Sequence, residues 1–150
     1  MGGLDSALLA ERTATVQRHL RRVASRLPSD RGALHPLSDE SDAVVLHLWQ
    51  AVQVVIDLAV SACVGLGLGA PPTYGDAFRA LADHGMLDRA LADRLMRAAG
   101  FRNLVAHAYA DLDLARVHDI ASEGGEDLLA FLAALRDHLD TLGDAPTSPQ

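Results

Sequence analysis

The feature that most constrains the fold of this chain is a long apolar segment over residues 38–64. Ser38 is a typical helix N-cap, and the two acids that follow it favour the start of a helix. Apolar residues then occupy almost every side of the helix, which is typical of a helix buried all round. Asp57 lies in the middle, where a carboxylate costs about 2.5–3.5 kcal/mol in a lipid bilayer. We therefore expect a buried central helix and no membrane contact.

Four further segments keep a helical period, at about residues 4–27, 75–83, 88–109 and 114–142, and Gly124-Gly125 is expected to interrupt the last. Aromatic residues make up only 4% of the chain, which favours helix over sheet. The connections are short, so neighbouring helices should run antiparallel. These features predict an all-α, up-and-down bundle of four to five helices. They also predict one domain over residues 1–142 and a polar tail over residues 143–150.

The connections contain recognisable caps and stops. Thr73 followed by Asp76 resembles a capping box, and Asp88 and Asp113 are expected to cap the next two helices. The glycine-rich stretch at residues 65–69 superficially resembles a phosphate-binding loop. It follows a helix rather than a strand and lacks the dinucleotide spacing, so we interpret it as a helix stop and a turn.

The charge of the chain is unevenly distributed. The net charge is −7, which argues against a dedicated nucleic-acid binder, and all thirteen basic residues are arginine. Residues 1–31 nevertheless contain six arginines against three acids, whereas the remainder is strongly acidic. Arg18, Arg21, Arg22 and Arg26 can share a helix face able to hold phosphates. The alternative is that they only form a solvated face.

The fourth predicted helix ends in the segment Arg102-Asn103-Leu104-Val105-Ala106-His107-Ala108-Tyr109. At about 100° per residue, Arg102 and Tyr109 fall on the same stripe as the core leucines Leu91 and Leu95. Arginine is rarely buried without a partner, so Arg102 is expected to have one. Asn103 and His107 are four residues apart and therefore neighbours on an adjoining face.

The central apolar helix has a matching polar stripe, formed by His47, Gln50, Gln53, Asp57 and Ser61. If this stripe faces the arginine-bearing helix or a partner subunit, the two helices line a polar cleft. If it faces water, this support for a site is lost.

An arginine and a histidine together suit phosphodiester chemistry. Histidine exchanges protons near neutral pH, and arginine presents planar donors to phosphate oxygens. RNA supplies its own nucleophile, the 2′-hydroxyl, so a base and a cation suffice without a metal or cofactor. A metal site from His107, Asp111 and Asp113 lacks a strong spacing signature. Cys63 is the only cysteine, and with no visible signal peptide it indicates a reducing cytoplasm, where it is expected to pack inertly.

The sequence "AGFRNLVAHAY" resembles the signature of the HEPN superfamily, specifically its HepT-like toxin branch. That signature is Arg-x4-His-x-Tyr, usually opening with Arg-Asn, and Arg102, Asn103, His107 and Tyr109 fill its positions. The similarity extends to "PPTYGDAFRALADHGMLDRALADRLMRAAG" upstream and to Gln-x-x-x-Asp at residues 53–57. It covers residues 38–142, and the first helix fits more loosely.

The resemblance implies an all-α homodimer with the two motif helices near the two-fold axis. It implies a metal-independent ribonuclease toxin acting on tRNA or mRNA. It also implies a cognate antitoxin, a minimal nucleotidyltransferase called MntA, that silences the toxin by attaching AMP to the motif tyrosine, here Tyr109.

We assign the expected roles accordingly. His107 is the general base, Arg102 holds the scissile phosphate, and Asn103 orients His107 or the RNA. Gln53 and Asp57 are supporting residues, and the possible RNA contacts are Arg18, Arg21 and Arg22. Two alternatives stay open. One is a catalytically silent, nucleotide-binding regulatory protein, and the other is a purely structural dimerising bundle in which Arg102 pairs with Asp57.

Overall fold

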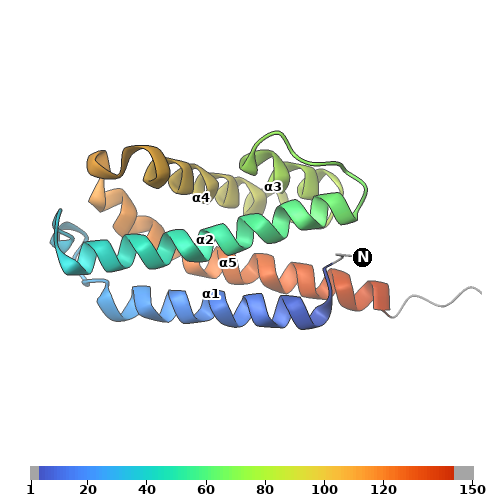
Figure 1. Cartoon of the computed structure of the whole chain (residues 1–150), viewed down its shortest axis with the longest axis horizontal. Coiled ribbons are helices and arrows are strands. Elements are labelled where there is room, and N and C mark those ends of the chain that lie inside the picture. Colours follow the sequence, from blue (N-terminus) through green and yellow to red (C-terminus); the bar gives the residue numbers. More distant parts are fainter. Residues whose placement is uncertain (1–3, 144–150) are drawn as a thin grey trace, which may run out of the picture.

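The computed structural model describes residues 4–143, which form five α-helices and two short 3-10 helices without a β-strand (Figure 1). In chain order these are α1 (Ser6–Arg26), η1 (Arg31–Ala33), α2 (Asp39–Gly65), α3 (Tyr74–Asp83), α4 (Arg89–Ala108), η2 (Tyr109–Asp111) and α5 (Leu114–Gly143). The predicted all-α helical bundle is confirmed.

Helix α2 is the centre of the bundle and packs against α1, α3, α4 and α5. In Figure 1 it runs between α4 above and α1 below. By length and composition alone α2 could cross a membrane, since its most apolar window has a mean hydropathy of 1.8. Half of that window is buried inside the bundle, so the other helices cover much of its apolar surface. The prediction of a buried central helix is confirmed.

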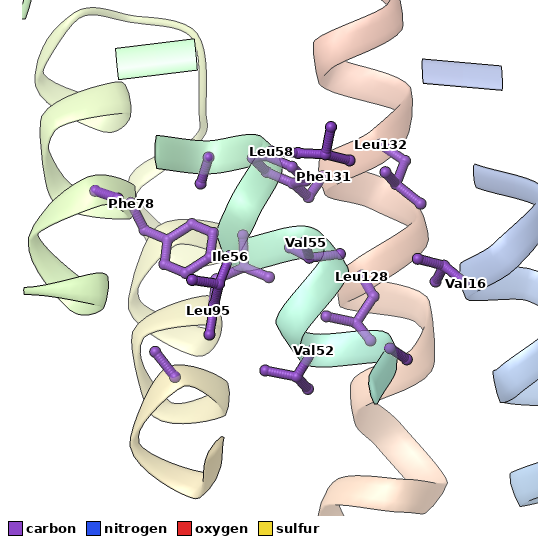
Figure 2. Packing of buried hydrophobic residues seen from close by; sticks show 14 of the residues in the cluster. Val16, Val52, Val55, Ile56, Leu58, Phe78, Leu95, Leu128, Phe131 and Leu132 are labelled. Carbon is purple, nitrogen blue, oxygen red and sulfur yellow. The ribbon is translucent and has the colours of Figure 1, made fainter. Parts of the chain in front are cut away.

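All five helices contribute to one apolar core. Figure 2 shows Phe78 of α3 and Phe131 of α5 reaching toward the α2 residues between them. The two phenylalanine rings meet edge to face, with centroids 5.7 Å apart and an interplanar angle of 86°. Such an aromatic pair stabilises by about 0.5–1.5 kcal/mol beyond the burial of its surface. Leu95 of α4 and Val16 of α1 are completely buried in the same cluster.

Three of the four predicted helix caps form as expected. The hydroxyl oxygens of Ser38 and Thr73 accept from the third backbone N–H that follows each residue, at 3.1 Å. Asp113 accepts from the backbone of α5 at 3.1 Å. Asp88 lies at the N-cap of α4 but makes no side-chain cap bond, so this prediction is only half right. At this exposed end, solvent can satisfy the first N–H groups of the helix instead.

The expected break of the last helix at Gly124-Gly125 is wrong, because α5 continues through both residues. A Cβ atom on Gly125 would lie 3.6 Å from the side chain of Leu20 on α1, so α1 packs closely against this point of α5. That packing offsets the low helix propensity of glycine, about 1 kcal/mol per residue.

Two expectations concern the ends of elements. Helix α4 ends at Ala108, so Tyr109 opens η2 instead of closing the helix. Gly143 belongs to α5, and the predicted tail beyond it lies outside the described residues. The assignment of residues 1–142 to one domain stays a prediction.

Candidate functional site

Arg102 lies on the inward stripe of α4, two turns after the buried Leu95, and is itself half-buried. Its Nε donates a hydrogen bond of 2.6 Å to Oε1 of Gln53 on α2. Its guanidinium carbon lies 5.0 Å from the ring centre of Tyr74 on α3, a cation–π arrangement. Arg102 therefore takes the place of a core leucine and joins three helices.

Gln53 continues the network, because its Nε2 donates to Oδ1 of Asp57 at 2.9 Å. Arg102 also donates through one Nη to Oδ1 of Asn103, at 3.3 Å. Arginine has five N–H donors, and these two bonds are the ones it makes within residues 4–143. The guanidinium thus keeps donors for a further acceptor. Gln53 stands between Arg102 and Asp57, so the ion pair of the structural alternative is not formed in the described part of the chain.

The polar stripe of α2 divides between two neighbours. Gln53 and Asp57 face the α4 side, as predicted for a cleft, through the bond to Arg102. His47 instead faces α1, where its Nδ1 lies 3.0 Å from Nδ1 of His19. His47 and Gln53 are six residues apart, which turns them about 120° from each other. The expectation of a single polar face is therefore wrong for His47.

His107 and Asn103 lie on the exposed side of α4. His107 makes no side-chain hydrogen bond within the described residues. It follows Arg102 by five residues, which corresponds to a rotation of about 140° and a rise of roughly 7.5 Å. The Arg102 and His107 side chains therefore leave α4 in different directions, and no hydrogen bond joins them within residues 4–143.

Tyr109 is tied to the N-terminal turn of α2. Its hydroxyl donates to Oδ1 of Asp42 at 2.5 Å, across 67 positions of sequence. This hydrogen bond, partial burial and the negative charge of Asp42 raise the pKa of Tyr109 to about 12. The side chain still has 46% of its surface exposed, so it is accessible from solvent.

Sequence reasoning missed two contributors to this region, Asp42 and Tyr74. Asp42 looked like an ordinary acid in the first turn of α2, where it also suits the helix dipole. Tyr74 opens α3 and gave no sign that its ring lies beside Arg102. Each contact joins residues far apart in the chain, so no local pattern indicated it.

The three arginines predicted to contact RNA lie on a different helix from Arg102. Arg18, Arg21 and Arg22 are exposed on α1, and α2 lies between α1 and α4 (Figure 1). No group of three or more histidine, cysteine or acidic side chains is placed to hold a metal ion in the part of the chain that the structure describes.

Comparisons with known proteins agree with this architecture. Residues 16–135 match the sequence profile of the family described as "Ribonuclease HepT-like". The chain is 26% identical over 129 residues to an mRNA nuclease HepT of Shewanella oneidensis, covering 86% of this chain and 96% of that protein.

Solved structures show the same fold. A Shewanella oneidensis HEPN toxin, described as tri-AMPylated and in complex with an MNT antitoxin, superposes with a TM-score of 0.78 at 24% identity. That match covers 89% of this chain and 99% of the toxin chain. A toxin–antitoxin structure with AMP-PNP superposes with a TM-score of 0.77 at 25% identity, covering 86% and 97% of the two chains.

Proposed function

Since the chain belongs to the HepT-like ribonuclease family, we propose that it is a ribonuclease toxin whose cleavage site is built around Arg102 and His107. The observation that supports this best is the setting of Arg102. The cation is half-buried, and Gln53 and Tyr74 hold it in place without a carboxylate partner among residues 4–143. A purely structural arginine in such a place would be expected to form an ion pair. The substrate class is RNA, with mRNA or tRNA as the target.

The proposed reaction needs a base and a cation. His107 removes the proton of a 2′-hydroxyl, and the 2′-oxygen attacks the neighbouring phosphorus atom. The bond from phosphorus to the 5′-oxygen breaks, and that oxygen takes up a proton. The products are a 2′,3′-cyclic phosphate and a 5′-hydroxyl. The free donors of Arg102 stabilise the negative charge that develops on the phosphate oxygens.

A symmetric homodimer brings the two groups together. Because Arg102 and His107 leave the helix about 140° apart, we expect a second copy to supply one of them to each site. Leu104 and Tyr109 add exposed apolar surface on this part of the chain, at 44% and 46% exposure, which suits an interface containing α4. A monomer at micromolar concentration in light scattering would contradict this arrangement.

Mixing two inactive variants tests the shared site directly. Arg102→Ala and His107→Ala homodimers each lack one group in both sites, so neither should cleave RNA. In a mixed dimer, one site has both groups, and random mixing should restore about a quarter of the wild-type activity. If both groups act from the same chain, mixing restores nothing.

The chemistry is tested by RNA cleavage in the presence of EDTA. Activity should persist, and the fragments should end in 2′,3′-cyclic phosphate. His84→Ala and Arg97→Ala, which change exposed residues of the same types, are matched controls and should stay active. A requirement for divalent ions, or full activity in His107→Ala, would contradict the mechanism. RNA binding without cleavage by the wild type would favour the regulatory alternative, and failure of Arg102→Ala to fold would favour the structural one.

A cognate nucleotidyltransferase antitoxin of the MntA kind would silence the toxin by transferring AMP from ATP to the hydroxyl oxygen of Tyr109, with pyrophosphate as the leaving group. Tyr109, at the C-terminal end of α4, is 46% exposed and therefore accessible to such an enzyme. The modification replaces the hydroxyl proton, so Tyr109 can no longer donate to Asp42. It also adds a negative phosphate about two turns from Arg102 on nearly the same stripe, where it would compete with RNA.

Mass spectrometry after incubation with the antitoxin and ATP tests this step. The chain has only two tyrosines, so Tyr74→Phe is a matched control that should still be modified, whereas Tyr109→Phe should not. Neutralisation of Tyr109→Phe without any adduct would indicate inhibition by binding alone.

A further inference from the structure

On the side of α2 that faces α1, two histidines form a pair. Nδ1 of His19 and Nδ1 of His47 lie 3.0 Å apart, the ring centres are 5.2 Å apart, and both side chains are half-buried. A hydrogen bond between these atoms requires one Nδ1 with a proton and one without. The ring that is bare at Nδ1 has its proton on Nε2. The ring that accepts the shared hydrogen bond therefore keeps an Nε2–H donor, which lies on the far edge of that ring.

Three arginines of α1 lie close enough to this pair for their charges to act on one or both rings. Arg18, Arg22 and Arg26 are spaced by four residues, so they form a stripe with steps of about 6 Å along the helix. All three are exposed, and none has an ion-pair partner within residues 4–143, whereas five other arginines do.

The positive charge of these arginines acts on the histidine pair. Partial burial lowers the pKa of His19, and the charges of His47, Arg18 and Arg22 lower it further. Partial burial also lowers the pKa of His47, together with the charges of Arg22 and Arg26. The cluster is thus a concentration of basic groups in a chain whose net charge is −7.

We propose that Arg18, Arg22 and Arg26, together with the His19–His47 pair, form a second phosphate-binding site that holds the backbone of single-stranded RNA away from the scissile bond. The inference rests on the proposed ribonuclease function. Guanidinium groups bind phosphate oxygens through paired donors, and the pair adds an N–H donor. Contacts to phosphates do not read the bases, so the site positions RNA of any sequence. A local basic site is needed because the acidic remainder of the chain repels RNA.

The position of the cluster relative to Arg102 supports this role. Helix α2 lies between α1 and α4 (Figure 1), so the arginine stripe and Arg102 flank the same helix. Two successive interhelix spacings place α1 and α4 at most about 16–20 Å apart. Gln50 and Leu46 lie on the surface of α2 between the two basic groups. A strand that crosses this surface meets Arg102 on one side and the arginine stripe on the other.

The sequence groups Arg21 with Arg18 and Arg22 as expected RNA contacts, but Arg21 points to another side of α1 and is not part of this cluster. Arg21 therefore provides a matched control within the same helix. It is exposed like Arg22 and adjacent to it, but it is turned about 160° from His19. Replacing either arginine by alanine removes the same charge from the same exposed helix. Only Arg22→Ala removes a group that acts on both histidines of the pair.

The test is the binding of a labelled, single-stranded DNA oligonucleotide, measured by fluorescence anisotropy at several salt concentrations. DNA has the same backbone charge but no 2′-hydroxyl, so it is bound without being cleaved. Each phosphate contact contributes about −0.7 to the slope of log K against log salt. Arg22→Ala should therefore reduce the slope by about 0.7 and weaken binding about 5-fold at 0.1 M salt. The triple alanine variant of Arg18, Arg22 and Arg26 should lose about 100-fold, and Arg21→Ala should keep the wild-type slope.

The possible outcomes separate the site from the proposed function. Equal losses in Arg22→Ala and Arg21→Ala would overturn the inference in favour of a diffuse positive surface, and wild-type binding by Arg22→Ala would overturn it outright. Both results leave the cleavage reaction at Arg102 and His107 untouched. If Arg22→Ala loses affinity while the wild type fails to cleave RNA, the binding site stands and the ribonuclease proposal fails.

Discussion

The bond between Tyr109 and Asp42 is the only side-chain hydrogen bond that joins residues 103–112 to another helix within the described residues. Tyr109→Phe removes the hydroxyl and keeps the ring. A hydrogen bond to a charged group contributes about 1.5–3 kcal/mol when water is excluded. Tyr109 is 46% exposed, so solvent replaces part of that contribution. We therefore expect the substitution to lower the free energy of unfolding by about 0.5–1.5 kcal/mol.

A double-mutant cycle with Asp42→Ala isolates this bond. The single substitution Asp42→Ala also removes an acid from the first turn of α2, which costs about 0.3–1 kcal/mol through the helix dipole. The contribution of the helix dipole cancels in the cycle. The coupling energy should therefore equal the ~0.5–1.5 kcal/mol expected for the bond, which is also the loss expected for Tyr109→Phe. The free energy of unfolding of each variant is measured by urea unfolding followed by circular dichroism. All variants are compared at one protein concentration, because the apparent stability of a dimer depends on concentration.

The pH dependence gives an independent check. The pKa of Tyr109 is raised from 10.0 to about 12, so the folded protein favours the neutral hydroxyl. The stability from this bond is complete below pH 10 and is lost as the pH rises toward 12. The difference between the wild type and Tyr109→Phe should narrow over that range. A coupling energy of zero at neutral pH would refute the reasoning, and with it the idea that AMP on Tyr109 acts partly by breaking this bond.

Three further predictions concern the bundle. Gly100→Ala should stabilise the protein by about 0.5–1 kcal/mol in thermal unfolding, because a Cβ atom there meets nothing within 4 Å among residues 4–143. Gly85→Ala should instead destabilise the protein, because Gly85 has a φ of +90°. Phe131→Ala should cost about 3–5 kcal/mol in urea unfolding, because the ring is completely buried. The pKa values of His19 and His47 lie below 6.5, so their contribution to stability is complete above pH 6.5 and lost as the pH falls. The stability lost between about pH 7 and pH 5 should therefore be smaller in His47→Gln, and a loss equal to that of the wild type would contradict this.

The sequence by itself determined the helices and their main caps. The bonds of a helix join residues four apart, and a capping side chain bonds the backbone two or three residues away, so contiguous residues contain this information. The apolar period also placed Arg102 in line with Leu95, and the structure confirms that position. The same local rules failed at Gly124-Gly125, where contact with Leu20 of a distant helix outweighs the low helix propensity of glycine.

Only the tertiary structure decided which groups meet at the site. The bonds from Arg102 to Gln53, and from Tyr109 to Asp42, span 49 and 67 positions of sequence. Periodicity shows which face a residue occupies but not which helix will pack against that face. That choice depends on how the apolar surfaces of all five helices are buried together, which no local pattern contains.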